Sequence, residues 1–513
     1  MQILLKVIIC LSILIYFPIY LKLVQDESHL YLFLKKYQPV FSLAAVFSFL
    51  LPPLSLFWLV FCFAVGTYGL LRFFQRGGFY IEESLIDFSM LYLALGGIWF
   101  AVFQMDWTFL GFSGLTALLT AIHFHYSSLY TLLFLGLLGR TLKEKGRLSK
   151  WYFAGGILLI ITPILVALGI TYSRVLEIAS VSVFMLGLFV YCGLSFSLQS
   201  IFIKLSSTSI FISISLSLLY SFRLVDIPIM VYMHGMINTV LFAGFGLYGY
   251  LKLSPKSHFD IKDLPISNIS GNRKMGIDFF SRQNFVEKNS VHPRGMVDDM
   301  GVFERKDFKA SNVHPMIKDF YVNTVDFNMD IFPNWNKFFY PLALIYKKIS
   351  DKMEQMNFPV NNYETTEVNS EMLKIIDKMD QRDNVRAWIR SDLRSRKAIY
   401  VAAYSTNPNS LGERFYNVFF PLPFGGMTSI LRINHYRNDG VSLTSVSDKR
   451  RNDLNGVYLK LFKKNFRIPI NETIDVWYEN NVLKAYHISY LLGIPVLELH
   501  YVMTPRDTNE KEA

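Results

Sequence analysis

Long apolar runs fill the first half of this chain and are nearly absent from the second half. Residues 1–250 hold almost all of these runs, whereas residues 251–513 alternate short polar and apolar stretches. The hydrocarbon core of a bilayer is about 30 Å thick, so a spanning helix needs about 20 apolar residues. The pattern therefore predicts a polytopic α-helical membrane domain followed by a water-soluble domain.

About nine membrane spans fit residues 1–250. The apolar run from Val40 to Phe73 is too long for one helix, and Pro52 and Pro53 interrupt it. Because proline breaks a helix interior, we predict a tight hairpin at that point. The predicted spans are 3–21, 39–51, 54–72, 86–104, 108–139, 152–171, 178–198, 206–221 and 228–250.

One loop of the membrane domain is strongly basic. Residues 140–150 contain five Lys and Arg residues. Cytoplasmic loops of membrane proteins carry an excess of these residues, so we place this loop in the cytoplasm. Four predicted spans follow it, and the soluble half should therefore also lie in the cytoplasm.

Three histidines lie within predicted spans. His123 and His125 belong to the span 108–139, and His234 belongs to the span 228–250. Ionisable residues inside a bilayer are costly, which makes each of them a functional hypothesis. His123 and His234 should share one depth in the outer half of the bilayer. Neutral imidazole binds Zn, Fe or Cu, so these histidines form a candidate metal or haem site.

The same histidines have two other interpretations. His123 and His125 are two residues apart, about 200° around a helix, so one helix cannot direct both at one point. His234 and Asn238, four residues apart, could serve only as a hydrogen-bonded connection between helices. A substrate or proton pathway is the third interpretation.

The soluble half begins with a mixed polar segment, 251–300, which we predict to be a linker. A domain at 301–505 and a polar tail at 506–513 follow. Apolar residues recur at helical spacing across 334–357, with lysines on the other face, which predicts an amphipathic helix. We expect its apolar face to cover a core, and the alternative is a helix that lies on the anionic inner leaflet. A second helix is predicted at about 370–382.

After Trp388 the apolar pattern changes to a period of two, which indicates strands. Short spacing between them predicts an antiparallel curved sheet, and the helix 334–357 is its expected cover. An α+β domain of this kind often encloses an apolar cavity. The predicted strands are 397–405, 414–420, 427–436, 440–446, 456–462, 472–479, 483–491 and 495–503.

The last predicted hairpin carries a polar cluster. If its turn centres between Gly493 and Ile494, His487 faces His500 and Ser489 faces Glu498, all on one side of the hairpin. These four residues, Ser489, His487, Glu498 and His500, are the candidate ligand-binding residues of the soluble half. The alternative is a pair of surface histidines on the outer face.

Composition excludes several classes of protein. The formal net charge is +11, but the excess of basic residues is spread over both halves, so we expect no nucleic-acid partner. The three cysteines, Cys10, Cys62 and Cys192, lie in apolar segments and form no Cys-x-x-Cys pair. A disulfide framework and a zinc ribbon are therefore excluded. No motif names a reaction, so the sequence leaves open whether the chain is an enzyme.

Several short motifs resemble one family. His123-Phe-His-Tyr in a span, the basic Gly-Arg loop after it and His234-Gly-x-x-Asn in the last span are similar to the YndJ-like membrane proteins of bacilli. The resemblance implies an uncharacterised, multi-pass protein of a bacterial cell membrane and supplies no catalytic residues. It extends to Gly301-Val-Phe-Glu-Arg, Phe320-Tyr-Val-Asn-Thr, Gln355-Met-Asn-Phe-Pro359 and Phe420-Pro-Leu-Pro423.

Three hypotheses of function follow from the sequence. The first is a cytoplasmic domain that binds an apolar or lipid-like ligand at the inner leaflet, because a curved sheet under an aromatic helix suits such a ligand. The second is a membrane-embedded enzyme that depends on a metal or haem held by the intramembrane histidines. The third is a transporter, although the paired half-helices and internal repeats typical of transporters are not visible.

The predicted orientation can be tested with reporter fusions after Pro255. Alkaline phosphatase fused there should be inactive, because it folds in the oxidising periplasm, and green fluorescent protein fused there should fluoresce. Fusions after Asp106, in the predicted outer loop between the spans 86–104 and 108–139, should give the opposite pair of results. Active phosphatase with dark fluorescent protein at Pro255 would contradict the cytoplasmic assignment.

Overall fold

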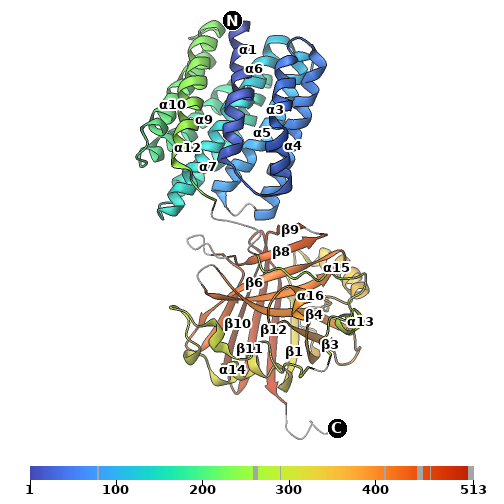
Figure 1. The fold of residues 1–513 in the computed structure, drawn as a ribbon. Coiled ribbons are helices and arrows are strands. Elements are labelled where there is room, and N and C mark those ends of the chain that lie inside the picture. The colour runs from blue at the N-terminus through green and yellow to red at the C-terminus, as the bar shows by residue number, and fades with distance from the viewer. Residues whose placement is uncertain are drawn as a thin grey trace. The chain divides into compact units, whose positions relative to one another are not determined.

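The chain folds as two compact units, Met1–Phe259 and Asp260–Ala513 (Figure 1). The first unit is a bundle of long helices, and the second is built mainly of strands. The computed structural model describes residues 1–77, 80–257, 264–288, 290–409, 412–447, 454–462 and 464–506.

Eight helical segments among the described residues are long and apolar enough to cross a membrane. This confirms a multi-span helical domain, although the predicted span 39–51 is not one of the eight. The segments are α1–η1–α2 (Gln2–Leu11, Ser12–Tyr16, Phe17–Leu23), η2–α4 (Pro52–Leu54, Ser55–Arg76), α5 (Ile81–Gln104), α6–η3–α7 (Gly114–His123, Phe124–Ser128, Leu129–Glu144), α8 (Lys150–Tyr172), α9 (Arg174–Ser195), α10 (Ile201–Ser221) and α11–η4–η5–α12 (Ile227–Ile229, Met230–His234, Ile237–Gly244, Phe245–Leu253).

A further helix, α3 (His29–Phe47), forms the predicted hairpin with α4. Just after its end, Ser48 accepts a hydrogen bond from Gln104 at the end of α5 over 2.6 Å. Just before its start, Asp26 accepts one from Tyr68 of α4 over 2.7 Å. The helix α3 therefore runs along the length of its neighbours, and it differs from the eight segments in being less apolar.

Three of the membrane helices contain π-helical segments, which change the regular pattern of backbone hydrogen bonds. Hydroxyl groups on neighbouring helices donate to carbonyl groups in or near these segments. Tyr16 of η1 donates to the carbonyl of Thr239 in η5 over 3.0 Å. Tyr126 of η3 donates to the carbonyl of Ile8 in α1 over 2.8 Å. These bonds join three helices, as a bilayer requires polar groups to be satisfied within the protein.

A cluster of buried charges joins the end of α4, the start of α5 and the end of α7. Arg72 contacts Asp87 over 2.8 Å and Glu83 over 3.1 Å, and Arg76 contacts the same two carboxylates. Arg140 contacts Glu83 over 2.7 Å. Each of these five side chains is at most 10% exposed. The hydropathy pattern gave no sign of this cluster, because its members lie where predicted spans begin and end.

The second unit contains a closed antiparallel barrel. Its strands pair in the order β5-β4-β3-β2-β1-β12-β11-β10-β7-β6, and β5 also pairs with β6, which closes the ring. The hairpin β8–β9 adds to the free side of β6. The strands are β1 (Phe327–Trp335), β2 (Thr366–Lys374), β3 (Arg386–Asp392), β4 (Ala398–Pro408), β5 (Arg414–Leu422), β6 (Gly425–Tyr436), β7 (Gly440–Thr444), β8 (Gly456–Leu461), β9 (Lys464–Arg467), β10 (Ile470–Glu479), β11 (Val482–Leu491) and β12 (Ile494–Pro505).

The barrel corrects the prediction of an open curved sheet covered by a long amphipathic helix. The helix α15 (Tyr340–Met353) is shorter than the predicted range 334–357, since β1 occupies the first positions of that range. Only Ala343 and Ser350 of α15 are fully buried. The closed ring shields most of its own interior, so α15 is not needed to cover it. The predicted helix 370–382 is wrong in its first part, which belongs to β2, and only Asp377–Asp380 of the range is an α-helix.

The segment predicted to be a linker, 251–300, is well packed where the structure describes it. Phe279, Phe280 and Met275 are fully buried against Ile389 of β3 and Val401 of β4. The outer face of these strands is therefore apolar and covered, as well as the inner face that lines the barrel. Short helical elements complete the unit: α13 (Phe279–Arg282), η7 (Met300–Phe303), η8 (Ala310–Asn312), α14 (Pro315–Val322), η9 (Thr324–Asp326) and α16 (Asp377–Asp380).

The charge cluster should be essential for stability of the membrane unit. Asp87→Asn keeps the shape of the side chain but leaves Arg72 and Arg76 without one of their carboxylates. Breaking a buried ion pair costs about 3–5 kcal/mol, so the thermal unfolding temperature in detergent should fall steeply. The matched control Asp106→Asn changes an exposed carboxylate and should shift stability by about 0.5 kcal/mol or less. Equal stabilities of the two variants would contradict this account.

Candidate functional site

The interior of the barrel contains a cavity of about 90 Å³. Eight strands already make a barrel wide enough to hold one small ligand, and this ring has two more. Most of the lining is apolar or aromatic, and α14 and the segment before it contribute to it. The aromatic and methionine side chains in the lining are Phe320, Phe420, Trp388, Tyr321, Tyr400, Tyr404, Tyr416, Tyr501, Met296, Met329 and Met503.

Strand β3 places a positive charge in this cavity. Successive side chains of a strand point to opposite faces, so Trp388 and Arg390 point inward while Ala387 and Ile389 pack against the outer cover. Arg390 is almost fully buried, with 6% of its surface exposed. Arg390, Glu472 and His487 are the three ionisable side chains other than tyrosine in this mainly apolar lining.

Aromatic groups surround the Arg390 guanidinium. Its Cζ lies 4.2 Å from the ring centre of Trp388 and 4.1 Å from that of Tyr400. Its Nη2 donates a hydrogen bond to the hydroxyl of Tyr404 over 3.1 Å. Burial raises the pKa of Tyr400 and Tyr404, so both hydroxyls stay neutral. No carboxylate among the described residues lies within ion-pair distance of Arg390.

Several polar atoms around this arginine have no hydrogen-bond partner within the described part of the chain. They are the Nε of Arg390, the Nε1 of Trp388 and the hydroxyl of Tyr416. All three residues line the cavity and are at least nine-tenths buried. An unsatisfied buried polar group costs about 1–3 kcal/mol. The cavity therefore presents donors that an acceptor group could satisfy.

A hydrogen-bonded pair of a histidine and a carboxylate lies elsewhere in the cavity wall. His487 of β11 donates from Nε2 to Glu472 of β10 over 2.9 Å. Burial acts to raise the pKa of Glu472, but the hydrogen bond and charge of His487 outweigh it and hold that pKa below its usual value. Glu472 is therefore a negative charge that already has its own partner.

The structure separates the four polar residues predicted on the last hairpin. The predicted register is one residue off, because His487 pairs with Leu499 and a bulge follows Ser489. His487 and Ser489 consequently lie on the inner face, whereas Glu498 and His500 lie on the outer face. There the His500 Nε2 is 3.9 Å from a carboxylate oxygen of Glu498.

Two strands that line the cavity, β1 and β3, were not predicted from the sequence. Strand β3 was not predicted, because the period of two was recognised only beyond Trp388. The sequence pattern that could have identified β3 is the alternation of Trp388 and Arg390 with the apolar Ala387 and Ile389. That alternation does not show which face points inward.

The three membrane histidines are only partly brought together. The rings of His123 and His234 are 6.0 Å apart between centroids. His125 is held separately, since its Nε2 accepts a hydrogen bond from Trp58 over 3.1 Å. Within the described ranges no group of three or more His, Cys, Asp or Glu side chains could hold a metal ion. Catalytic zinc sites use three protein ligands, whereas only two of these three histidines lie close together. A metal or haem at the histidines therefore stays a prediction.

His234 has the contacts expected of a connection between helices. Its Nδ1 lies 2.8 Å from the hydroxyl of Ser213 in α10, and its Nε2 lies 3.0 Å from the amide nitrogen of Asn238. His123 instead bonds within its own helix, where Nδ1 is 2.7 Å from the carbonyl of Leu119. These contacts favour the structural interpretation of His234.

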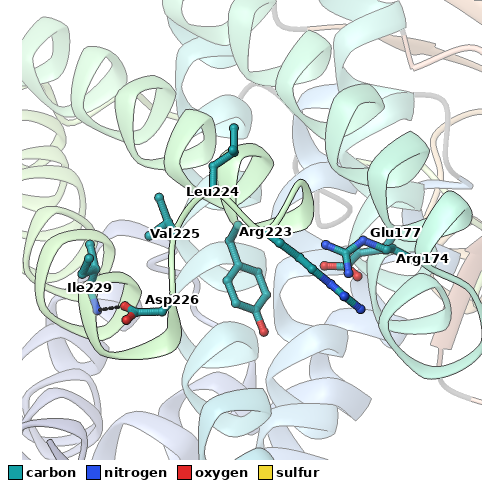
Figure 2. A pocket seen from close by; sticks show the side chains of 8 residues that line it. Arg174, Glu177, Arg223, Leu224, Val225, Asp226 and Ile229 are labelled. Carbon is teal, nitrogen blue, oxygen red and sulfur yellow. Dashed lines mark hydrogen bonds between the residues drawn. The ribbon is translucent and has the colours of Figure 1, made fainter.

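A second cavity, of about 590 Å³, lies where α9 begins and α10 ends (Figure 2). Arg174, Glu177, Arg223 and Asp226 line it, and Asp226 accepts a hydrogen bond from the backbone of Ile229 over 3.1 Å. Most of its lining side chains are exposed. Charged groups at the ends of membrane helices are expected to be solvated there. The barrel cavity, with few polar groups in an apolar wall, is the better candidate site.

The histidine contacts predict unequal effects of two substitutions. His234→Ala removes a bond between helices and should cost about 0.6–1.7 kcal/mol, and His123→Ala should cost less. Thermal unfolding in detergent measures both effects, and the double variant should be additive within about 0.3–0.5 kcal/mol. A larger coupling, together with loss of bound metal in each single variant, would indicate one shared site instead.

Comparison with known proteins agrees with the resemblance seen in the motifs. A family model described as "YndJ-like protein" matches residues 7–242. A relative from Bacillus subtilis (strain 168), described as "Uncharacterized membrane protein YndJ", is 33% identical over 465 residues, which is 88% of this chain and 83% of the relative. No solved structure shows a significant match. The chain therefore belongs to the YndJ-like family of membrane proteins.

Proposed function

We propose that the barrel binds a small, mainly apolar ligand with a single acidic head group, and that the membrane unit anchors this barrel at the inner leaflet. The apolar lining of the cavity supports the first part of the proposal. Ligand sites are typically concave and apolar, with a few polar groups that fix the orientation of the ligand.

The buried guanidinium of Arg390 is the observation that carries the proposal. Removing a charge from water costs several kcal/mol unless a partner compensates it. Stacking on Trp388 and Tyr400 returns only about 2 kcal/mol. A ligand carboxylate would supply the missing negative charge and accept hydrogen bonds from Arg390, Trp388 and Tyr416. Arginine suits this role because its planar fork matches a carboxylate.

The size and charge of the cavity narrow the ligand. At about 90 Å³ the cavity is much smaller than the 300–1,000 Å³ typical of drug-sized ligands. The flexible side chains of Met296, Met329 and Met503 can adapt to an apolar chain of modest length. The negative charge of Glu472 in the same wall disfavours a head group with two charges.

The cytoplasmic location of the barrel is the second part of the proposal. The backbone carbonyl of Pro255, just after the last membrane helix, accepts a hydrogen bond from Arg140 over 3.3 Å. Arg140 begins the basic loop 140–150, so the chain leaves the membrane unit at the same end as that loop. An excess of basic residues marks the cytoplasmic side of membrane proteins, which supports a barrel in the cytoplasm.

A matched pair of probes tests ligand binding on the full-length protein in lipid nanodiscs. Hexanoate and 1-hexanol share an apolar chain but differ in charge. Hexanoate should bind at least about tenfold more tightly by calorimetry, because a charge-assisted hydrogen bond contributes about 1.5–3 kcal/mol. Arg390→Gln should remove this preference. The same substitution removes a buried charge that has no carboxylate partner among the described residues. The unfolding temperature of the ligand-free protein should therefore stay unchanged or rise.

The control for this experiment is Arg394→Gln, which changes an arginine that is 79% exposed beyond the end of β3. It should retain the preference for hexanoate. Equal binding of both probes by the unchanged protein would contradict an acidic head group. Binding of neither probe would contradict a ligand site in the barrel altogether.

A further inference from the structure

The helix α15 leaves a row of large apolar side chains uncovered. Phe338 just before it is 76% exposed, Leu342 and Ile345 are each 59% exposed, and Ile349 is 50% exposed. Their spacing of four, three and four residues places them on one face of the helix. Leu344 beside them is 48% exposed. Contiguous apolar patches of this kind on a soluble domain mark interaction sites.

The opposite face fixes α15 to the barrel unit. Ala343 and Ser350 are buried, and Tyr346 packs against the inner core while its hydroxyl donates to the carbonyl of Met356 over 3.3 Å. Lys347 donates to the side chain of Asn357 over 2.6 Å. The face of α15 that packs on the barrel unit is thus more polar than the exposed face. The larger apolar side chains of the helix point away from its own domain.

Basic residues flank the exposed row. Lys337, Lys348 and Lys352 are exposed, and Lys348 and Lys352 lie one turn apart beside Ile345 and Ile349. An apolar row with flanking lysines is typical of helices that lie in the interface of an anionic membrane. Each such lysine near an anionic surface contributes to binding. This charge pattern favours lipid over an apolar protein surface as the occupant.

The covalent connection keeps this face within reach of a membrane. Helix α12 ends at Leu253, and the second unit is described from Leu264 onward. The intervening chain, even fully extended, reaches at most about 3.3–3.6 Å per residue, or roughly 40 Å in total. The connection therefore limits the distance between Leu253 and Leu264 to roughly 40 Å.

The entry segment and α15 meet the same end of β5. Gly271, soon after the connection, donates its backbone N–H to the carbonyl of Leu422 over 3.1 Å. Gln355, just after α15, donates its side chain to the carbonyl of Pro421 over 3.0 Å. Phe424, in the turn that follows β5, is 67% exposed. The segment around Gly271, the end of α15 and the exposed Phe424 thus lie at the same end of the barrel.

We infer that the apolar face of α15, formed by Phe338, Leu342, Ile345 and Ile349, docks on the anionic lipid surface of the membrane that this protein's own helices cross. The face inserts its apolar side chains between lipid head groups, and Lys348 and Lys352 contact lipid phosphates. Docking gives the barrel a fixed orientation on the membrane. This inference is independent of the ligand proposed for the barrel cavity.

Photocrosslinking in the full-length protein tests the inference. Ile345 is replaced by the photoreactive residue p-benzoylphenylalanine, and the protein is placed in nanodiscs in which a quarter of the lipid is phosphatidylglycerol. Irradiation should give a lipid adduct in the intact mass. The matched control carries the same residue in place of Glu371, an exposed polar position on β2, and should give little adduct. Leu342 provides a second test position if the variant at Ile345 expresses poorly.

The charges provide an internal check. The double variant Lys348→Glu/Lys352→Glu should reduce the adduct at position 345 by at least about fivefold, and nanodiscs of phosphatidylcholine alone should reduce it similarly. Adduct yields at positions 345 and 371 that are equal would overturn the inference. A crosslink from position 345 to the protein's own membrane helices or to a second copy, in place of lipid, would also overturn it.

Discussion

The pairing of β5 with β6 is the constraint on which the second unit depends. Without it these two strands would be open edges, which expose unpaired backbone groups and favour aggregation. The pairing runs from Tyr416 opposite Leu431 to Leu422 opposite Gly425. β6 is paired with β8 on its other side over the same stretch. This crowding requires glycine at 425, where a Cβ atom would lie 1.8 Å from the carbonyl oxygen of Lys460.

Closure of the ring also explains the two most unusual surfaces of the unit. Inside, the ring shields aromatic side chains from water, and Arg390 lies among them with no carboxylate of the described residues within ion-pair distance. Outside, α15 does not direct its large apolar side chains at the barrel, so its apolar row at Leu342 and Ile345 remains exposed. The proposed ligand site and the proposed membrane contact are thus two consequences of the same closure.

The membrane unit meets a different constraint, which is that polar groups must find partners inside the protein. The hydroxyls of Tyr16 and Tyr126 satisfy this requirement for carbonyl groups in neighbouring helices. The buried cluster around Glu83 and Asp87 satisfies it for charges, because two or more arginines contact each of these carboxylates. Both arrangements join helices that are far apart in the sequence.

The sequence by itself determined the features that depend on local periodicity. Apolar runs of sufficient length located the membrane helices, and Pro52 with Pro53 located the hairpin between α3 and α4. Alternation with a period of two located all eight of the predicted strands, which correspond to β4 to β8 and β10 to β12. The family resemblance was likewise visible in short motifs, because a motif is a local property of the chain.

Only the tertiary structure decided which faces and which distant residues meet. The bulge after Ser489 moves His487 and His500 to opposite faces, and a shift of one residue in register cannot be read from alternation alone. Ring closure depends on the pairing of strands β5 and β6 and on their continuation through β1 to β3, which the pattern did not reveal. Whether Arg390 has a counter-ion depends on every wall of the barrel at once. Local sequence patterns predict individual strands of the wall. Which strands face one another across the cavity is decided only when the ring closes.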